Sequence, residues 1–185
     1  MKRILILLLL LTNGLALLAQ QDQFIEILRQ ESAELLKLEQ EISYYRNLVL
    51  KKASIKDLYQ ENNLALIKQN LDDVLGLLEQ EIQNRQIDSA KLKLGELDLV
   101  YGEIAELADR LLYYRAKLAN LQNNPRKARI HLEKIRADYP QSEIMNLVVK
   151  MLGENYFYSG YDQRILDLYQ EYSQWIDFDV AYKLA

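Results

Sequence analysis

Residues that interrupt helices are scarce in this chain. Only six Gly and two Pro occur among its 185 residues, whereas Leu, Glu, Lys, Gln and Ala are abundant. Gly costs about 1 kcal/mol and Pro about 3 kcal/mol in a helix interior relative to Ala, so their scarcity favours long helical segments. There is no cysteine either, so packing without disulfides must hold the fold. The sequence therefore predicts an all-α protein.

The first nineteen residues have the layout of a secretory signal peptide. Lys2 and Arg3 form a basic tip, residues 4–11 are all aliphatic, and a small residue precedes Gln20. A signal peptidase recognises this order of basic, apolar and small-residue regions. We therefore expect residues 1–19 to be removed and the protein to be periplasmic or otherwise exported to the bacterial cell envelope. The alternative is a retained anchor, and membrane contact is expected only through that uncleaved segment.

The charge balance argues against nucleic acid as a partner. The net charge of the chain is −4, and it becomes −6 if Lys2 and Arg3 leave with the signal segment. An acidic protein has no general electrostatic attraction to a phosphate backbone. We therefore expect no nucleic-acid partner.

Residues 20–70 predict a helical or coiled-coil arm. Apolar residues recur there at heptad spacing. This seam consists of Leu28, Leu35, Leu38, Ile42, Tyr45 and Val49. A glutamate, Glu31, occupies one place of the seam.

The arm is expected to contain a helix boundary. The pattern predicts helices over 22–52 and 55–84, with Ser54 and Asp57 as a capping box between them. One long coiled coil, an antiparallel hairpin and a helix packed on its own domain all fit this pattern. Self-association through the arm is one of these alternatives.

Shorter helices follow, each marked by residues that favour helix ends. Asn124 precedes Pro125, and this pair predicts an N-cap followed by the first helical residue. Gly160 is expected to take the left-handed conformation that ends a helix. Further N-caps are expected at Asp88, Ser142 and Asp162. This succession predicts stacked helical hairpins.

Residues 109–142 resemble a tetratricopeptide repeat in the spacing of their large and small positions. The matching residues are Leu112, Ala116, Ala128, Leu132 and Pro140, while Arg115 and Ala119 depart from the family pattern. A second match covers 146–179 through Val149, Leu152, Gly153, Tyr156, Ile165 and Tyr169, with Asp177 in place of the closing proline. A weaker match covers 71–104 through Val74, Leu78, Ala90 and Leu94. The resemblance implies an α-solenoid of such hairpins over 71–179.

The resemblance also implies a concave groove lined by the first helix of each repeat. The inward-facing places of the two better matches are Arg110, Tyr113, Lys117, Asn120, Lys150, Glu154 and Phe157. Cations beside aromatic rings would suit an extended peptide that carries a carboxylate or acidic side chains. We expect these residues to bind the partner.

Catalytic and metal-binding patterns are not found. His131 is the only histidine, and without Cys partners it predicts no metal site. Acid pairs such as Glu96 with Asp98 carry no mark of a shared or buried site, and acids on a helix surface are ordinarily solvated. We therefore expect a non-enzymatic protein without a cofactor.

The order of signal segment, arm and repeats resembles periplasmic adaptors of the Tol–Pal-associated type. This likeness implies an exported scaffold for protein–protein interactions. Residues 180–185, apolar except for Lys183, predict the start of a further helix. We expect the chain to be a fragment of a longer protein; the alternative is that this end folds back as its own cap. The alternatives to the scaffold are the helical part of a larger cell-wall enzyme and a membrane-anchored coiled-coil spacer.

Overall fold

The structure, a computed structural model, is all-helical, as the sequence predicts. It describes the backbone of residues 2–173 and the side chains of residues 23–173. Within this part of the chain there are helices and no strand. The elements are α1 (Lys2–Gln60), α2 (Leu64–Gln83), α3 (Ile87–Tyr101), the 3₁₀ helix η1 (Ala105–Leu107), α4 (Ala108–Leu121), α5 (Pro125–Asp138), α6 (Met145–Phe157) and α7 (Asp162–Tyr172). The helix expected from 180 lies outside the described residues.

The chain divides into two compact units, Met1–Asn47 and Leu48–Ala185. In the first unit the described residues form a single helical segment, the greater part of α1. The side chains of the expected signal segment, 1–19, lie outside the described residues. Within the part of the chain that the structure describes, no helix is both long and apolar enough to cross a membrane.

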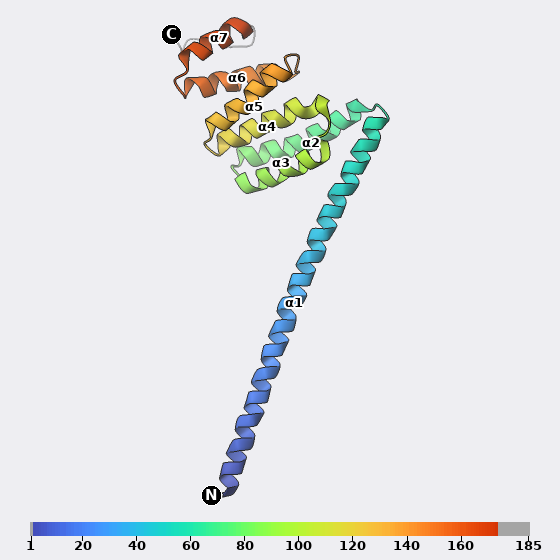
Figure 1. Cartoon of the computed structure of the whole chain (residues 1–185), viewed down its shortest axis with the longest axis vertical. Helices are drawn as coiled ribbons and strands as arrows, with labels where there is room; N and C mark the ends of the chain where they lie inside the picture. Colours follow the sequence, from blue (N-terminus) through green and yellow to red (C-terminus); the bar gives the residue numbers. More distant parts are fainter. Residues whose placement is uncertain (1, 174–185) are drawn as a thin grey trace. The chain divides into compact units, whose positions relative to one another are not determined.

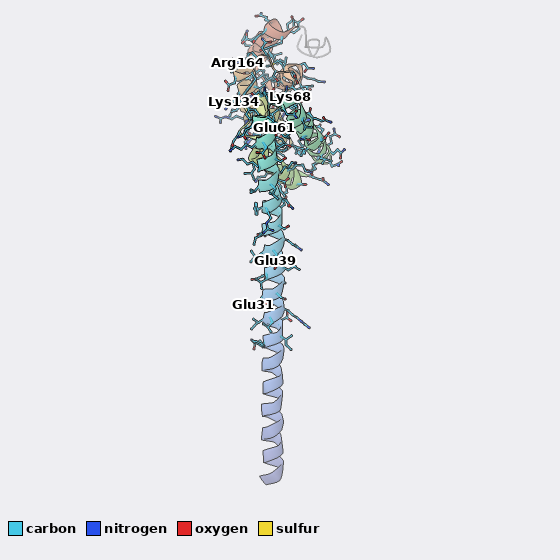
Figure 2. The ribbon with its side chains drawn as sticks, turned by 90° about the vertical axis from the view of Figure 1, so that its right-hand side faces the viewer. Glu31, Glu39, Glu61, Lys68, Lys134 and Arg164 are labelled. Carbon is cyan, nitrogen blue, oxygen red and sulfur yellow. The ribbon has the colours of Figure 1, made fainter. Side chains whose placement is uncertain are left out.

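The heptad seam of the first unit is exposed. Leu35, Leu38 and Ile42 are 62, 53 and 59% exposed. Acidic side chains stand out from the same helix, among them Glu31 and Glu39 (Figure 2). Among the residues that the structure describes, this unit contains no second helix that could cover the seam.

The helix boundary expected at Ser54 is wrong, because α1 continues to Gln60. The last turns of α1 belong to the second unit and pack on the rest of that unit through a stripe that includes Lys52, Ile55 and Tyr59. Ile55 is buried in the core, and the Lys52 Nζ lies 2.6 Å from Glu103 Oε1. These contacts favour helix through Ser54. The chain turns only at Asn62, whose φ of 61° is a left-handed conformation that Asn tolerates.

The second unit consists of helices that each pack against the next one in the chain. The ribbon from α2 to α7 shows this succession (Figure 1). On α2 the buried residues recur at helical spacing, as the set Ile67, Leu71, Leu75, Leu78 and Ile82. One apolar cluster joins the end of α1 with α2, α3 and α4, and a second joins α4 to α7. Each fully buried Leu or Ile contributes about 1.5–3 kcal/mol, and these clusters supply the main stabilisation.

Two predicted helix ends are confirmed. Asn124 is the N-cap of α5, where its Oδ1 accepts a hydrogen bond from the Lys127 N–H at 3.0 Å, and Pro125 is the first helical residue. Gly160 has a φ of 69° between α6 and α7. Each end depends on a property of one residue, the side-chain oxygen of Asn124 and the missing side chain of Gly160. The local sequence therefore predicts both ends.

The other predicted N-caps are wrong. Asp88 and Asp162 lie in the first turns of α3 and α7, where an acidic side chain still interacts favourably with the helix dipole. Ser142 precedes α6 by three residues, and its hydroxyl donates to Asp109 while it accepts from the Ile144 N–H. Its hydrogen bonds therefore fix the loop before α6.

Two glycines of this unit should respond in opposite ways to alanine substitution. A Cβ at Gly102 would overlap the backbone carbonyl oxygen of Asp98, whereas a Cβ at Gly95 would have no neighbour within 4 Å. We expect Gly102→Ala to lower the free energy of unfolding by about 1–3 kcal/mol through overpacking. Gly95→Ala, inside α3, should raise it by about 0.5–1 kcal/mol. Urea unfolding followed by circular dichroism measures both, and equal effects would contradict this geometry.

Candidate functional site

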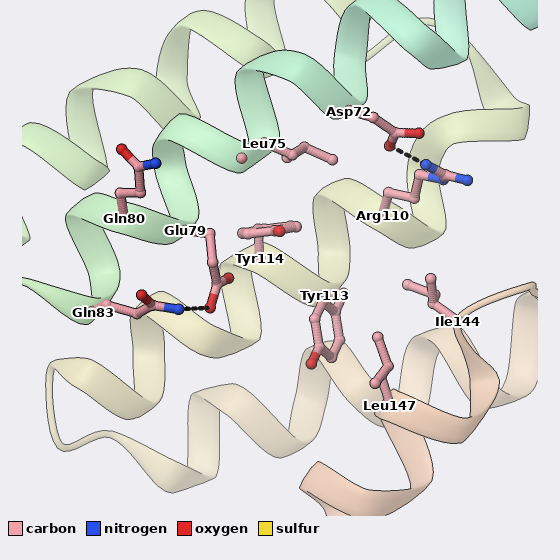
Figure 3. A pocket seen from close by; sticks show the side chains of 11 residues that line it. Asp72, Leu75, Glu79, Gln80, Gln83, Arg110, Tyr113, Tyr114, Ile144 and Leu147 are labelled. Atoms are coloured by element: carbon pink, nitrogen blue, oxygen red, sulfur yellow. Dashed lines mark hydrogen bonds and ion pairs between the residues drawn. The ribbon is translucent and has the colours of Figure 1, made fainter.

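A groove runs between α2, α4 and the start of α6 (Figure 3). Its volume is about 460 Å³. The residues that line it are Asp72, Leu75, Gly76, Glu79, Gln80, Gln83, Arg110, Tyr113, Tyr114, Ile144 and Leu147. All of them belong to the second unit, and no lining residue comes from α3, α5 or α7.

Two adjacent tyrosines form the floor of the groove. Tyr113 is buried, Tyr114 is half-buried, and their rings meet edge to face with centroids 5.8 Å apart. In Figure 3 the ring of Tyr113 lies on the side of Leu147, while that of Tyr114 lies between α4 and Glu79. Burial, followed by the charge of Glu79, raises the pKa of both phenols to about 12. The floor is therefore uncharged at neutral pH.

Lys117 is held inside this site. Its ammonium forms an ion pair with Glu79 and lies 5.7 and 5.5 Å from the ring centroids of Tyr113 and Tyr114. Both distances are within the range of a cation–π interaction. The Lys117 and Glu79 side chains are only 20 and 28% exposed, so water screens this pair less than a surface pair.

Arg110 closes one end of the groove. Its guanidinium forms an ion pair with Asp72 of α2, and its Nη2 donates to Glu143 Oε2 at 2.9 Å. Lys68 Nζ approaches the other oxygen of Glu143 at 3.3 Å. These contacts tie α2, α4 and the loop before α6 together.

The structure brings three of the predicted site residues together. Arg110 and Tyr113 line the groove, and Lys117 lies against its tyrosines. The other four, which do not line it, are the half-buried Asn120 and the exposed Lys150, Glu154 and Phe157. Of these, Glu154 is close enough for its charge to help raise the pKa of Tyr113.

The expected chemistry of the groove needs correction. The sequence suggests that Arg110 and Lys117 are available for an acidic peptide, but both cations are already paired with carboxylates of α2. Breaking such a pair to bind a ligand carboxylate would leave the α2 carboxylate without its partner. An acidic ligand therefore gains little here.

Sequence reasoning missed the α2 side of the groove. Asp72 and Glu79 each stand 38 residues before their partners, Arg110 and Lys117. The same step of 38 separates the small-residue places of the matches at 71–104 and 109–142, Leu78 and Ala116. Asp72 and Glu79 occupy, in the weaker match at 71–104, the same inward-facing positions that Arg110 and Lys117 occupy at 109–142. Applying the pattern to the weaker match would therefore have identified these acids.

Comparisons with protein-family models, with curated proteins and with solved structures give no match for this chain. Among the residues that the structure describes, no group of His, Asp and Glu side chains could hold a metal ion.

The contacts of Glu143 predict a pH-dependent contribution to stability. Hydrogen bonds from Lys68 and Arg110, together with their charges, lower its pKa from the ordinary 4.5. A carboxylate with a lowered pKa stabilises the fold above pH 4.5, and this contribution is lost as the pH falls through the lowered value. Wild type should therefore unfold at higher urea than Glu143→Gln at pH 7, and the difference should disappear toward pH 3.

A matched control for this experiment is Glu61→Gln, which removes a carboxylate on which no ion pair is found among the described residues. Its difference from wild type should be smaller at every pH. A difference between wild type and Glu143→Gln that persists unchanged at pH 3 would contradict the assignment.

Proposed function

We propose that this protein is an exported, non-enzymatic interaction scaffold of the bacterial cell envelope. Its groove between α2, α4 and α6 binds an extended segment of another envelope protein. The observation that carries this proposal is an open groove whose cations are paired internally and whose floor is two uncharged tyrosines. Of the two, the half-buried Tyr114 offers contact area to a ligand, and an aromatic side chain loses little entropy on binding.

We also propose that α2–α7 are three tetratricopeptide-like hairpins forming an α-solenoid. Two ion pairs that connect residues 38 apart support this, because equivalent places in adjacent repeats lie beside each other. The positions where the repeat pattern has a small residue support it too. Ala116 is fully buried, and a Cβ at Gly153 would lie 3.9 Å from Leu168 Cδ2.

The ligand segment is proposed to be mainly apolar. The exposed Leu147 and the half-buried Tyr114 offer apolar contact, and the charged groups of the groove largely neutralise one another. Gln80 adds a side-chain amide at one end, and Gln83, whose Nε2 donates to Glu79 Oε1 at 3.3 Å, adds its amide oxygen; both can bind the backbone of an extended peptide. Apolar side chains thus supply most of the affinity, and the amides orient the segment.

Gly76 supports the groove as a binding surface. It lies inside α2, where Gly costs about 1 kcal/mol relative to Ala. A Cβ there would meet nothing within 4 Å, so packing within the protein does not require glycine. The missing side chain instead leaves space in the groove for a ligand.

A peptide selection tests the groove. Twelve-residue peptides selected from a random library on the full chain should be rich in apolar residues and poor in acidic ones. Gly76→Trp should weaken their binding by about tenfold or more, because an indole would occupy the groove. Fluorescence anisotropy with the selected peptides measures this loss.

The matched control is Gly95→Trp, also a helix-interior glycine with nothing within 4 Å of its Cβ but outside the groove. It should leave peptide affinity unchanged. Equal binding to wild type and Gly76→Trp would contradict the proposal. Selection of acidic peptides would contradict the proposed ligand chemistry.

The exposed seam of α1 favours a second role, self-association. Burying Leu35, Leu38 and Ile42 against a second copy would remove large apolar side chains from water, at about 1.5–3 kcal/mol for each. Glu31 stands in the same seam and opposes association, because pairing would desolvate its charge. We propose that two copies associate through this seam.

Substituting glutamates on opposite faces of α1 tests this pairing. Glu31→Leu should tighten self-association by about tenfold, since it replaces a charge in the seam with an apolar side chain. Glu26→Leu makes the same chemical change on the opposite face and should have little effect. Leu38→Glu should weaken association. Sedimentation equilibrium of the full chain measures all three, and a wild-type monomer unaffected by Glu31→Leu would contradict the pairing.

A further inference from the structure

A second hollow lies between α3, α4 and α5. Its volume is about 370 Å³. The polar and charged residues that line it are Lys91, Asp98, Arg115, Gln122, Lys127 and His131. It shares no lining residue with the groove between α2, α4 and α6.

The hollow is locally positive in an acidic protein. Arg115 and Asp98 cancel each other, with Arg115 Nη2 2.7 Å from Asp98 Oδ1. The ammonium groups of Lys91 and Lys127 have no ion-pair partner among the described residues. Two uncompensated cations therefore line one hollow, although the net charge of the chain is −4. Such a local field attracts an anion.

His131 adds a hydrogen-bonding group to these cations. Its half-buried imidazole has no hydrogen-bond partner among the described residues. Burial lowers its pKa, and the charges of Arg115, Lys127 and Lys134 lower it further, whereas Asp98 acts in the opposite direction. Lys134 stands out from α5 (Figure 2), and Lys91 faces the same hollow from α3. An anion among these groups would offset the cations and favour the imidazolium.

We propose that this hollow binds a tetrahedral oxyanion, the phosphoryl group of a small phosphate ester or free phosphate. Lys91 and Lys127 supply charge, while His131 and the Gln122 amide supply directed hydrogen bonds. Several donors suit an anion with several acceptor oxygens better than they suit a single-charged chloride. The proposal is independent of the peptide groove, because it uses other residues on other helices.

The single histidine makes the test specific. In the full chain, the proton on Cε1 of His131 gives a single NMR signal without overlap from other histidines. Inorganic phosphate added at constant ionic strength should shift this signal saturably, and glycerol 1-phosphate should do so if the ester is accepted. Sulfate, whose charge is constant near neutral pH, should raise the pKa of His131.

Charge-removing variants then locate the site. Lys127→Gln and Lys91→Gln should each weaken phosphate binding by about tenfold, since each removes a charge-assisted contact. Lys150→Gln makes the same change on α6 and should have no effect. Gly95→Trp should block phosphate but not peptide, because Gly95 lines this hollow.

Two results would overturn the proposal. One is a shift that is linear in phosphate and matched by chloride, which indicates non-specific association of anions rather than a site. The other is saturable binding that Lys91→Gln and Lys127→Gln leave unchanged while circular dichroism shows both variants folded. Loss of peptide binding in Gly76→Trp without loss of phosphate binding would keep the two sites distinct.

Discussion

The position of α4 against α2 determines the geometry of the groove. Apolar packing brings helices together but is not directional, so it fixes their relative translation only weakly. Two ion pairs supply direction: Arg110 with Asp72, and Lys117 with Glu79. They stand two helical turns apart on each helix, so a slide of one turn would break both. The same pairs neutralise the groove and hold Lys117 against the tyrosines, which links the register of the fold to the chemistry of the site.

Local chemistry made part of this structure predictable. The all-α class follows from the scarcity of Gly and Pro, and the ends at Asn124 and Gly160 follow from cap geometry that each residue sets for itself. The boundary near Ser54 was not predictable, because burial of Ile55 in the core outweighs a capping pattern. Tertiary contacts override local signals in this way whenever a helix face finds a partner.

The structure brings part of the predicted site together, but it pairs the cations with carboxylates that the sequence analysis did not identify. Arg110 and Tyr113 lie in the groove, but a sequence does not state which charges a cation will meet. The acids that pair with Arg110 and Lys117 come from the weakest repeat match, 38 residues earlier. The hollow around His131 was missed altogether, because it depends on Lys91 of α3 and Lys127 of α5 facing one space. The spacing of Lys91 and Lys127 in the sequence does not indicate that both residues line the same hollow.

We propose that α2, α4 and α6 act together as one binding surface for an apolar segment. Amide hydrogen exchange with and without a selected apolar peptide tests it most directly. We expect added protection on α2, α4 and the start of α6, with α3, α5 and α7 unchanged. Protection confined to α5 or to the seam of α1 would contradict this proposal, since the ligand would then bind outside the groove between α2, α4 and α6.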